Sequence, residues 1–297
     1  MKDTILMQIA NGLSTNVQKL TSPGLLEGKM GVAIYLYLYS GYSGYTGCKH
    51  FADNLIDEVI TGISERDISI ATGLSGIGWG INHLMKERFI QGEDNLLADF
   101  DECILQYIKD HSDENMPDGC IFLTFDHPKP LDEPIMQVFA RQFPIFLSSA
   151  AYPLYILNKL LAVANCMLNK HLYPWYNMLL NAAVYAIHTK EYHHSDLVIC
   201  RDLLEAFPGK KDNQPWRELY DCCSSGLSTG ISYTDHLETV WQKRVFLGGA
   251  TEVQHDMNQI SMYVAHKLKD LHTQDMFFSV GLPAVGMNII LASQSAL

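Results

Sequence analysis

Pairs of glycines recur along the chain, and each pair stands at the start of an apolar stretch long enough for a helix. Similar segments at intervals that leave room for two helices and their turns indicate a repeat of helical hairpins. The first glycine of a pair can take a positive φ in the turn, and the second removes a Cβ where the helix start meets its neighbour. The pairs are Gly28 and Gly31, Gly73 and Gly76, Gly226 and Gly230, and Gly281 and Gly286.

Two kinds of helix alternate between these glycines. Residues 55–63 and 97–108 carry apolar side chains on one helical face only, which is typical of a half-exposed helix. Other segments are apolar on nearly all sides and are expected to be buried helices: residues 31–39, 77–85, 146–157 and 285–292. The sequence therefore predicts an all-α fold, an α/α toroid (barrel) of helical hairpins with inner and outer layers, forming a single domain over residues 1–297.

The middle of the chain departs from this pattern. Small residues at 148–152 (SSAAY) take the place of the glycines and are interpreted as a degenerate copy of the repeat. A short apolar run at 120–125 (CIFLTF) is the one predicted strand, and we expect it in a loop excursion.

Composition excludes several classes of protein. With 297 residues, 47% of them hydrophobic, the chain can bury a large core, and its formal net charge of -12 makes nucleic acid an unexpected partner. The most apolar stretch, residues 143–168, contains Pro153 and Lys159, so we expect a buried helix and no membrane span. The N-terminal residues lack the apolar core of a secretion signal, and seven scattered cysteines do not form a disulfide framework, so we expect a cytoplasmic protein.

The glycine segments resemble those of a known family. The strings GLLEGKMGVAIYLY, ATGLSGIGWGINHL and FSVGLPAVGMNIIL are similar to the motifs of the lanthionine synthetase C-like family, the peptide cyclases of lantibiotic biosynthesis and their relatives. The resemblance implies a toroid of paired helices with the glycine turns at the mouth of a central cavity. It also implies a zinc ion, held by two cysteines and one histidine, that activates a peptide thiol for addition to a dehydrated Ser or Thr.

The cysteines of this chain do not reproduce the ligand motifs of that family. Its cyclases carry one cysteine in a Trp-Cys-Tyr-Gly-like string and a second one followed by His and Gly, and neither string occurs here. The nearest match is Cys222-Cys223, just ahead of Gly226, with Cys200 as the other candidate ligand by its order along the chain. Adjacent cysteines in a helix diverge by about 100°, so Cys222 and Cys223 can hardly bind one ion together. No zinc ligand is assigned, and these three residues remain candidates.

Other polar residues offer candidate chemistry, each with a structural alternative. His83, beside Trp79 on one predicted helix, is a candidate cavity residue or a packed, hydrogen-bonded histidine. Asp235 and His236 form a candidate acid/base pair or a structural pair. The segment 188–196 (HTKEYHHSD) has a metal-binding composition without the spacing of a helical zinc site, and we interpret it as a solvated helix end.

Three functional hypotheses follow. The first is a lanthionine synthetase C-like protein, either a peptide cyclase or a zinc-less pseudoenzyme, that binds a substrate or leader peptide in the cavity and works with other peptide-modification enzymes. The second is an α/α-barrel carbohydrate enzyme, which needs two carboxylates across a cleft; the candidates are Glu87, Asp235 and Glu238, and nothing in their spacing is specific. The third is a binding module without chemistry.

Overall fold

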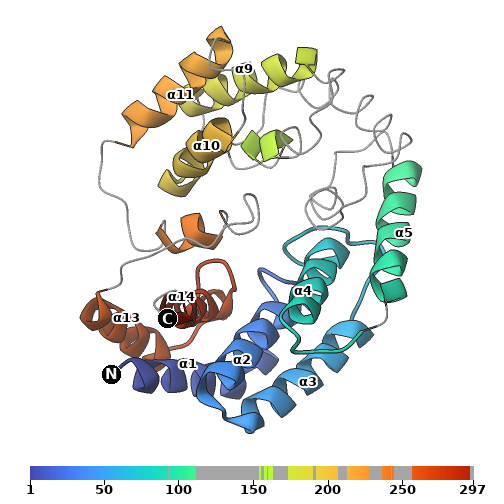
Figure 1. Ribbon diagram of the computed structural model, residues 1–297, viewed down its shortest axis with the longest axis vertical. Coiled ribbons are helices and arrows are strands. Elements are labelled where there is room, and N and C mark those ends of the chain that lie inside the picture. Colours follow the sequence, from blue (N-terminus) through green and yellow to red (C-terminus); the bar gives the residue numbers. More distant parts are fainter. Residues whose placement is uncertain are drawn as a thin grey trace. The chain divides into compact units, whose positions relative to one another are not determined.

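The computed structural model describes residues 1–92, 94–111, 154, 157–158, 160–162, 173–189, 192–206, 213–227, 236–241, 243 and 256–294. All regular structure in these residues is helical, as Figure 1 shows, so the all-α prediction is confirmed for this part of the chain. The α-helices are α1 (Lys2–Asn16), α2 (Lys29–Ser43), α3 (Thr46–Thr61), α4 (Leu74–Lys86), α5 (Asp94–Asp110), α9 (Tyr173–Thr189), α10 (His194–Ala206), α11 (Gln214–Gly226), α13 (Met257–Lys269) and α14 (Leu282–Gln294). Two short 3-10 helices are η1 (Val17–Lys19) and η3 (Thr273–Met276).

The chain divides into two compact units. The first unit joins Met1–Ile104 to Thr251–Leu297, and the second unit is Leu105–Ala250. The first unit thus contains both ends of the chain: α1 packs against α13 and α14, and α14 packs against α2. The single domain expected over residues 1–297 stays a prediction.

The core of the first unit is built around α2. All its side chains from Met30 to Tyr39 are buried, as expected for the apolar segment 31–39. Helix α3, which packs along α2, buries Leu55, Ile56 and Val59 and exposes its other face, including Ile60. The predicted alternation of buried and half-exposed helices is therefore present in this unit. The buried face of α3 contains fewer residues than its predicted apolar face, because Ile60 is exposed.

Two tyrosines of α2 fix its neighbours by their hydroxyl groups. Tyr35, fully buried, donates a hydrogen bond to the Leu6 carbonyl oxygen of α1 at 2.9 Å. Tyr37 donates to the Asp53 carboxylate of α3 at 2.5 Å. Buried tyrosines need such partners for their polar ends, so this aromatic segment serves the core.

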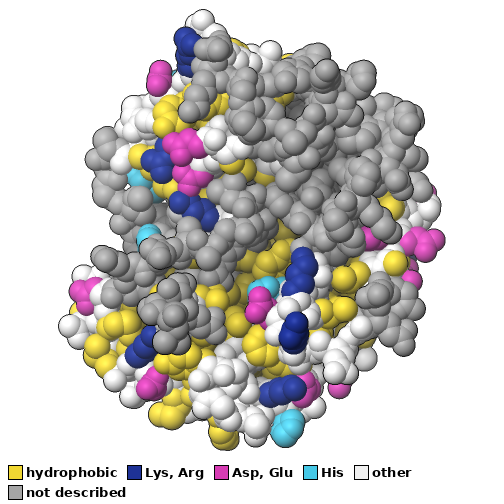
Figure 2. Space-filling model, in the orientation of Figure 1, with side chains coloured by type: hydrophobic (Ala, Val, Ile, Leu, Met, Phe, Trp, Pro, Cys, Tyr) yellow, Lys and Arg dark blue, Asp and Glu magenta, His cyan; other side chains and the backbone are white. Residues whose placement is uncertain are grey.

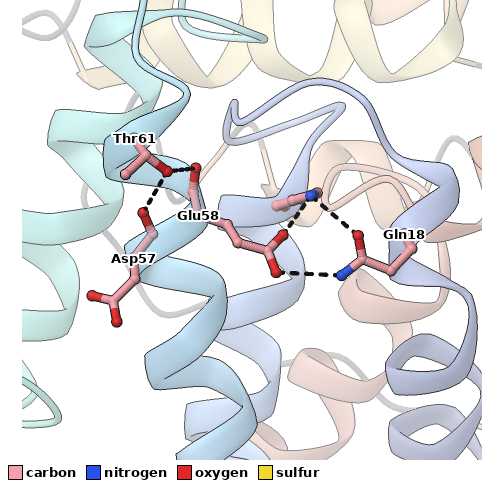
Figure 3. Close-up of polar contacts among 5 residues, drawn as sticks. Gln18, Asp57, Glu58 and Thr61 are labelled. Atoms are coloured by element: carbon pink, nitrogen blue, oxygen red, sulfur yellow. Dashed lines mark hydrogen bonds and ion pairs between the residues drawn. The ribbon is translucent and has the colours of Figure 1, made fainter.

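A polar cluster at the surface joins the entrance of α2 to α3 and η1 (Figure 3). Glu58 of α3 forms an ion pair with Lys29 at 2.5 Å and accepts a hydrogen bond from Gln18 at 3.3 Å. Lys29 also donates to Gln18 at 3.5 Å. Glu58 is 41% exposed, and such exposed ion pairs contribute about 0–1 kcal/mol, so the cluster orients these elements more than it stabilises them.

The second unit contains α9, α10 and α11, with α11 packed against both α9 and α10. Helix α10 buries Leu197–Cys200, Leu203 and Leu204. Helix α11 begins after Asn213, has a proline in its first turn, and buries Trp216, Leu219 and Cys223, spaced by three and four residues along one face. The Trp216 indole N–H donates to the Leu204 carbonyl oxygen at 3.3 Å, which ties α11 to the end of α10.

Some predicted features lie outside the described residues. These are the strand at 120–125, the glycine-free repeat at 148–152 and most of the apolar helix 146–157, of which Leu154 and Leu157 are described and buried. Across the described part of the chain, none of the helices combines the length and apolar character that a membrane span requires.

Candidate functional site

Three segments of seven residues lead into apolar helices of the first unit and are named here the entry loops. The first covers residues 22–28, the second 67–73 and the third 275–281, which begins with the last two residues of η3; the helices that follow them are α2, α4 and α14. Gly28 and Gly73 are the N-caps of their helices, with φ of -146° and -110°. The positive φ predicted for the first glycine of each pair is therefore wrong at both positions.

The last residue of each entry loop is glycine because a Cβ there would clash with the backbone, and not because the position needs a positive φ. A Cβ at any of the three would lie within 3.0 Å of the carbonyl oxygen six residues earlier in the chain. These pairs are Gly28 with Ser22, Gly73 with Asp67, and Gly281 with Asp275. The N–H that follows the glycine uses the same carbonyl in the first two loops: Lys29 donates to Ser22 at 3.0 Å and Leu74 to Asp67 at 2.8 Å. Each loop thus folds back on its helix entrance.

The second glycine of two pairs receives a side chain from another entry loop. Phe278 of the third loop lies against Gly31 of α2, where a Cβ would come within 2.9 Å of the Phe278 Cγ. Leu25 of the first loop lies against Gly76 of α4 in the same way, at 2.8 Å from the added Cβ. Both side chains stand three residues before the last glycine of their own loop. The predicted close approach at Gly31 and Gly76 is confirmed.

Backbone hydrogen bonds link the loops in the same order. The Phe278 N–H donates to the Leu26 carbonyl oxygen at 2.8 Å, and the Leu26 N–H donates to the Ala71 carbonyl oxygen at 2.9 Å. The spatial order is therefore third loop, first loop, second loop, so the repeat from the C-terminal part of the chain stands next to the N-terminal one.

The other predicted glycines play different parts. Gly286 lies within α14, where a Cβ would collide with the ring of Tyr35, so it makes room for a core side chain and is not equivalent to Gly31. Gly226 is the last residue of α11 and lies against Leu197, which corrects the prediction that it opens a helix. The atoms nearest to Gly226 belong to the flexible side chain of Leu197, whereas Gly31 and Gly76 contact residues of the entry loops. Gly230 is outside the described residues.

His83 and Trp79 lie together on α4. Their rings stack with centroids 5.2 Å apart and an interplanar angle of 9°, and both residues are half-buried. Gly80, the residue of α4 after Trp79, packs against Met30 of α2. This part of α4 therefore has one buried face and, beside it, a partly exposed pair of aromatic rings. Glu87 is the exposed C-cap of the same helix.

The three candidate cysteines come together in the second unit. Cys200 of α10 and Cys223 of α11 are both fully buried, on helices that pack against each other. The nearby Cys223 thiol, followed by burial, raises the pKa of Cys200 well above its ordinary value. Cys222 turns to a different neighbour, with its Sγ 3.6 Å from Nε2 of His188 on α9. The divergence predicted for Cys222 and Cys223 is thus present in α11.

This cluster does not fit a zinc site. Zinc requires three or four ligands around one point, with thiolate sulfurs at about 2.3 Å. Within the described ranges no three His, Cys, Asp or Glu side chains are arranged to hold a metal ion. Cys200 and Cys223 are neighbouring buried thiols, while Cys222 and His188 form a separate pair. Zinc therefore enters no chemical step derived from these residues.

The remaining histidine candidates lie around α10. Asp196, buried at the start of this helix, accepts a hydrogen bond from the His193 backbone N–H at 3.0 Å, a cap that orders the junction with α9. His188 and His193 are exposed, but Ser195 and Asp196 are buried, so the interpretation of residues 188–196 as a solvated helix end is wrong for its last residues. Glu191 lies outside the described residues. Sequence reasoning assigned no structural role to Asp196, although Asp two residues inside a helix start is a capping signal.

The predicted acid/base pair is described only in part. His236 is half-buried, and burial, followed by the nearby Lys243, lowers its pKa. Asp235 lies outside the described residues. Glu238 accepts a hydrogen bond from Ser195 at 3.3 Å, so its carboxylate serves the contact between its helix and α10. Glu238 belongs to the second unit and Glu87 to the first.

Comparison with known proteins adds no assignment. Searches against protein-family models, curated proteins and solved structures found no match. The residues themselves therefore carry the functional argument. Sequence reasoning missed Leu25 and Phe278; aligning the three loops on their last glycine would have revealed an apolar residue at the same position in each, with Ile70 in the second loop.

Proposed function

We propose that this chain is a lanthionine synthetase C-like protein that binds a peptide and lacks the zinc-dependent thioether chemistry. The observation that carries this proposal is the common geometry of the entry loops. They contain the same glycine segments on which the resemblance rests, and they use these glycines in one repeated contact.

The entry loops also support the proposed toroid. Two of the three loops pass a side chain to the second glycine of the next repeat, from Phe278 to Gly31 and from Leu25 to Gly76. A contact that repeats at the same positions adds each hairpin by a similar rotation, and repeated rotations generate a ring when they close. The placement of the last repeat before the first is what a closed ring requires.

The thiol cluster favours binding over the usual chemistry of the family. A zinc-activated thiol needs a cysteine pair and a histidine around one point, and Cys200, Cys222, Cys223 and His188 divide into two separate pairs. Peptide binding needs no such site. Other enzymes of a peptide-modification pathway would then supply the chemistry.

Charge points to a basic peptide. The formal net charge is -12, and on the face drawn in Figure 2 the basic side chains of the described residues are interspersed with acidic ones, without a broad basic patch. An acidic protein attracts cationic ligands over distances near the Debye length, about 10 Å at 0.1 M salt.

Fluorescence anisotropy with labelled peptides tests the proposal. A Lys-rich peptide containing Ser, Thr and Cys is expected to bind, with an affinity that falls as salt rises, whereas a peptide with Glu in place of each Lys is expected not to bind. Trp79→Ala, on the half-buried pair of α4, is expected to weaken binding, with the exposed Tyr45→Ala as a control.

Metal analysis separates the proposal from its alternatives. Purified protein and the Cys222→Ala, Cys223→Ala double variant are expected to contain no stoichiometric zinc. About one zinc per chain, lost in the double variant, would replace this proposal with a zinc-dependent cyclase. Absence of peptide binding together with release of reducing ends from a polysaccharide panel would favour the carbohydrate enzyme.

A further inference from the structure

The thiols of the second unit have a chemistry that does not depend on a metal or on the proposed peptide. We propose that Cys200 and Cys223 are a dithiol that closes to a disulfide by exchange with a small-molecule disulfide, and that Cys222 is the thiol that meets the oxidant first.

The first support is the placement of the two buried thiols. Cys200 lies on α10 and Cys223 on α11, helices that pack against each other, and both side chains have no exposed surface. The Cys223 thiol lies near enough to Cys200 to be the first cause of its raised pKa. A disulfide needs Cα atoms about 4.4–6.8 Å apart and side chains that point at each other, and two buried, neighbouring thiols on packed helices are placed to form one.

The second support is the position of Cys222. It is partly exposed, next to Cys223 in the sequence, and its Sγ lies 3.6 Å from Nε2 of His188, an exposed residue in the last turn of α9. An imidazole nitrogen at this distance can take the thiol proton and leave the thiolate, which is the nucleophile in exchange. A disulfide in solution reaches Cys222 before it reaches the buried pair.

Exchange then proceeds in three balanced steps. The Cys222 thiolate attacks one sulfur of the disulfide RSSR, its proton passing to His188, and the other half leaves and is protonated to RSH. The Cys222 side chain, now carrying the RS group, turns from His188 toward α10, where Cys200 is its neighbour. Cys200 attacks the Cys222 sulfur, forming a Cys200–Cys222 bond, and its proton leaves with the second RS group as RSH. Cys223 attacks the Cys200 sulfur, and Cys222 leaves as a thiol. The net change oxidises Cys200 and Cys223 by two electrons and reduces RSSR to two RSH.

The local charges set the rate of this relay. Burial, with Cys223, Glu218 and Asp221 adding to it, raises the pKa of Cys222, so little thiolate is present at neutral pH. The exchange therefore depends on transfer of the Cys222 proton to His188 as the attack begins. A disulfide between two buried sulfurs, once formed, is sheltered from reductants in solution.

Peptide mapping of the whole chain after exposure to oxidised glutathione tests the proposal. Trypsin releases Cys200 in the peptide 191–201 and both Cys222 and Cys223 in the peptide 218–243. After acid quenching and alkylation we expect these peptides joined by a disulfide that fragmentation places at Cys223, and we expect dithiothreitol to separate them. Free Cys200 at saturating oxidised glutathione, in protein whose circular dichroism is native, would overturn the proposal.

Single substitutions separate the pair from the entry thiol. Cys222→Ser is expected to form the same cross-link about tenfold more slowly, because the accessible attacking thiol is gone. Cys223→Ser is expected to stop at a Cys200–Cys222 disulfide or at glutathione on Cys222. Cys48→Ser, a buried thiol of α3, is the matched control and is expected to behave like the wild type. An unchanged rate in Cys222→Ser would refute the proposal that Cys222 reacts first with the oxidant. If a variant fails to fold, the peptide map of the wild-type protein still shows whether Cys200 and Cys223 form a disulfide.

Discussion

Replacing Gly31 with alanine tests the entry-loop contact directly. A Cβ at this position would lie 2.9 Å from the Phe278 Cγ and even closer to the Leu25 carbonyl oxygen, and neither atom belongs to the free end of a flexible chain. Overpacking of this kind costs about 1–3 kcal/mol, and the obstacle in the backbone places the cost near the upper end. Alanine recovers up to about 1 kcal/mol of helix propensity. The expected net loss is about 2 kcal/mol, equivalent to a Tm about 4–8 °C lower for a unit of this size.

Gly41→Ala on the same helix is the matched control. Gly41 is exposed, and the nearest atom to an added Cβ is in the Phe89 ring at 3.1 Å. We expect its stability to be unchanged or slightly higher, because the gain in helix propensity remains without a backbone clash. Urea unfolding followed by circular dichroism gives both values, and hydrogen exchange locates the loss in α2 and the third entry loop. Equal stability of the two variants would refute the reasoning.

Three further predictions concern the two cores. Phe278→Ala is expected to lose about 3–5 kcal/mol in urea unfolding, because a fully buried ring leaves a cavity beside α2. Burial raises the pKa of Tyr35 and of Tyr37, so the unfolded chain loses these protons first and the free energy of unfolding should fall as pH rises above about 10, which unfolding at several alkaline pH values measures. Oxidation of Cys200 and Cys223 closes a loop of about 24 residues and is expected to stabilise the second unit by about 3 kcal/mol, measured as the change in its urea midpoint with and without dithiothreitol.

Much of the first unit could be predicted because its signals are local. The apolar run at 31–39 is buried throughout, and the loss of a Cβ at Gly31 and Gly76 is used for close packing. The role of Gly28 was predicted wrongly, because a glycine is required both where φ is positive and where a neighbouring atom occupies the Cβ position. The sequence cannot distinguish these causes, since the crowding atom at Ser22 is fixed only by the fold of the loop.

The candidate site was less predictable because its contacts join distant residues. Cys200 and Cys223 both occupy core-facing positions of their helices, beside Leu203 and Leu219 in the apolar stripes, and that placement is visible in the sequence. Their contact with each other depends on how α10 and α11 pack, which helical periodicity does not specify. The pairing of Cys222 with His188 depends in the same way on the packing of α9 and α11.

The order of the entry loops also affects synthesis of the protein. The buried helix α2 is synthesised well before Phe278, whose side chain covers Gly31 and whose N–H donates to Leu26, because roughly 240 residues separate the two. Contacts between such distant residues form slowly, because the intervening chain must be brought together first. Until then one side of α2 lacks its cover and presents apolar surface to the cell. The nascent chain should therefore bind chaperones through α2, and release from them should follow synthesis of α14.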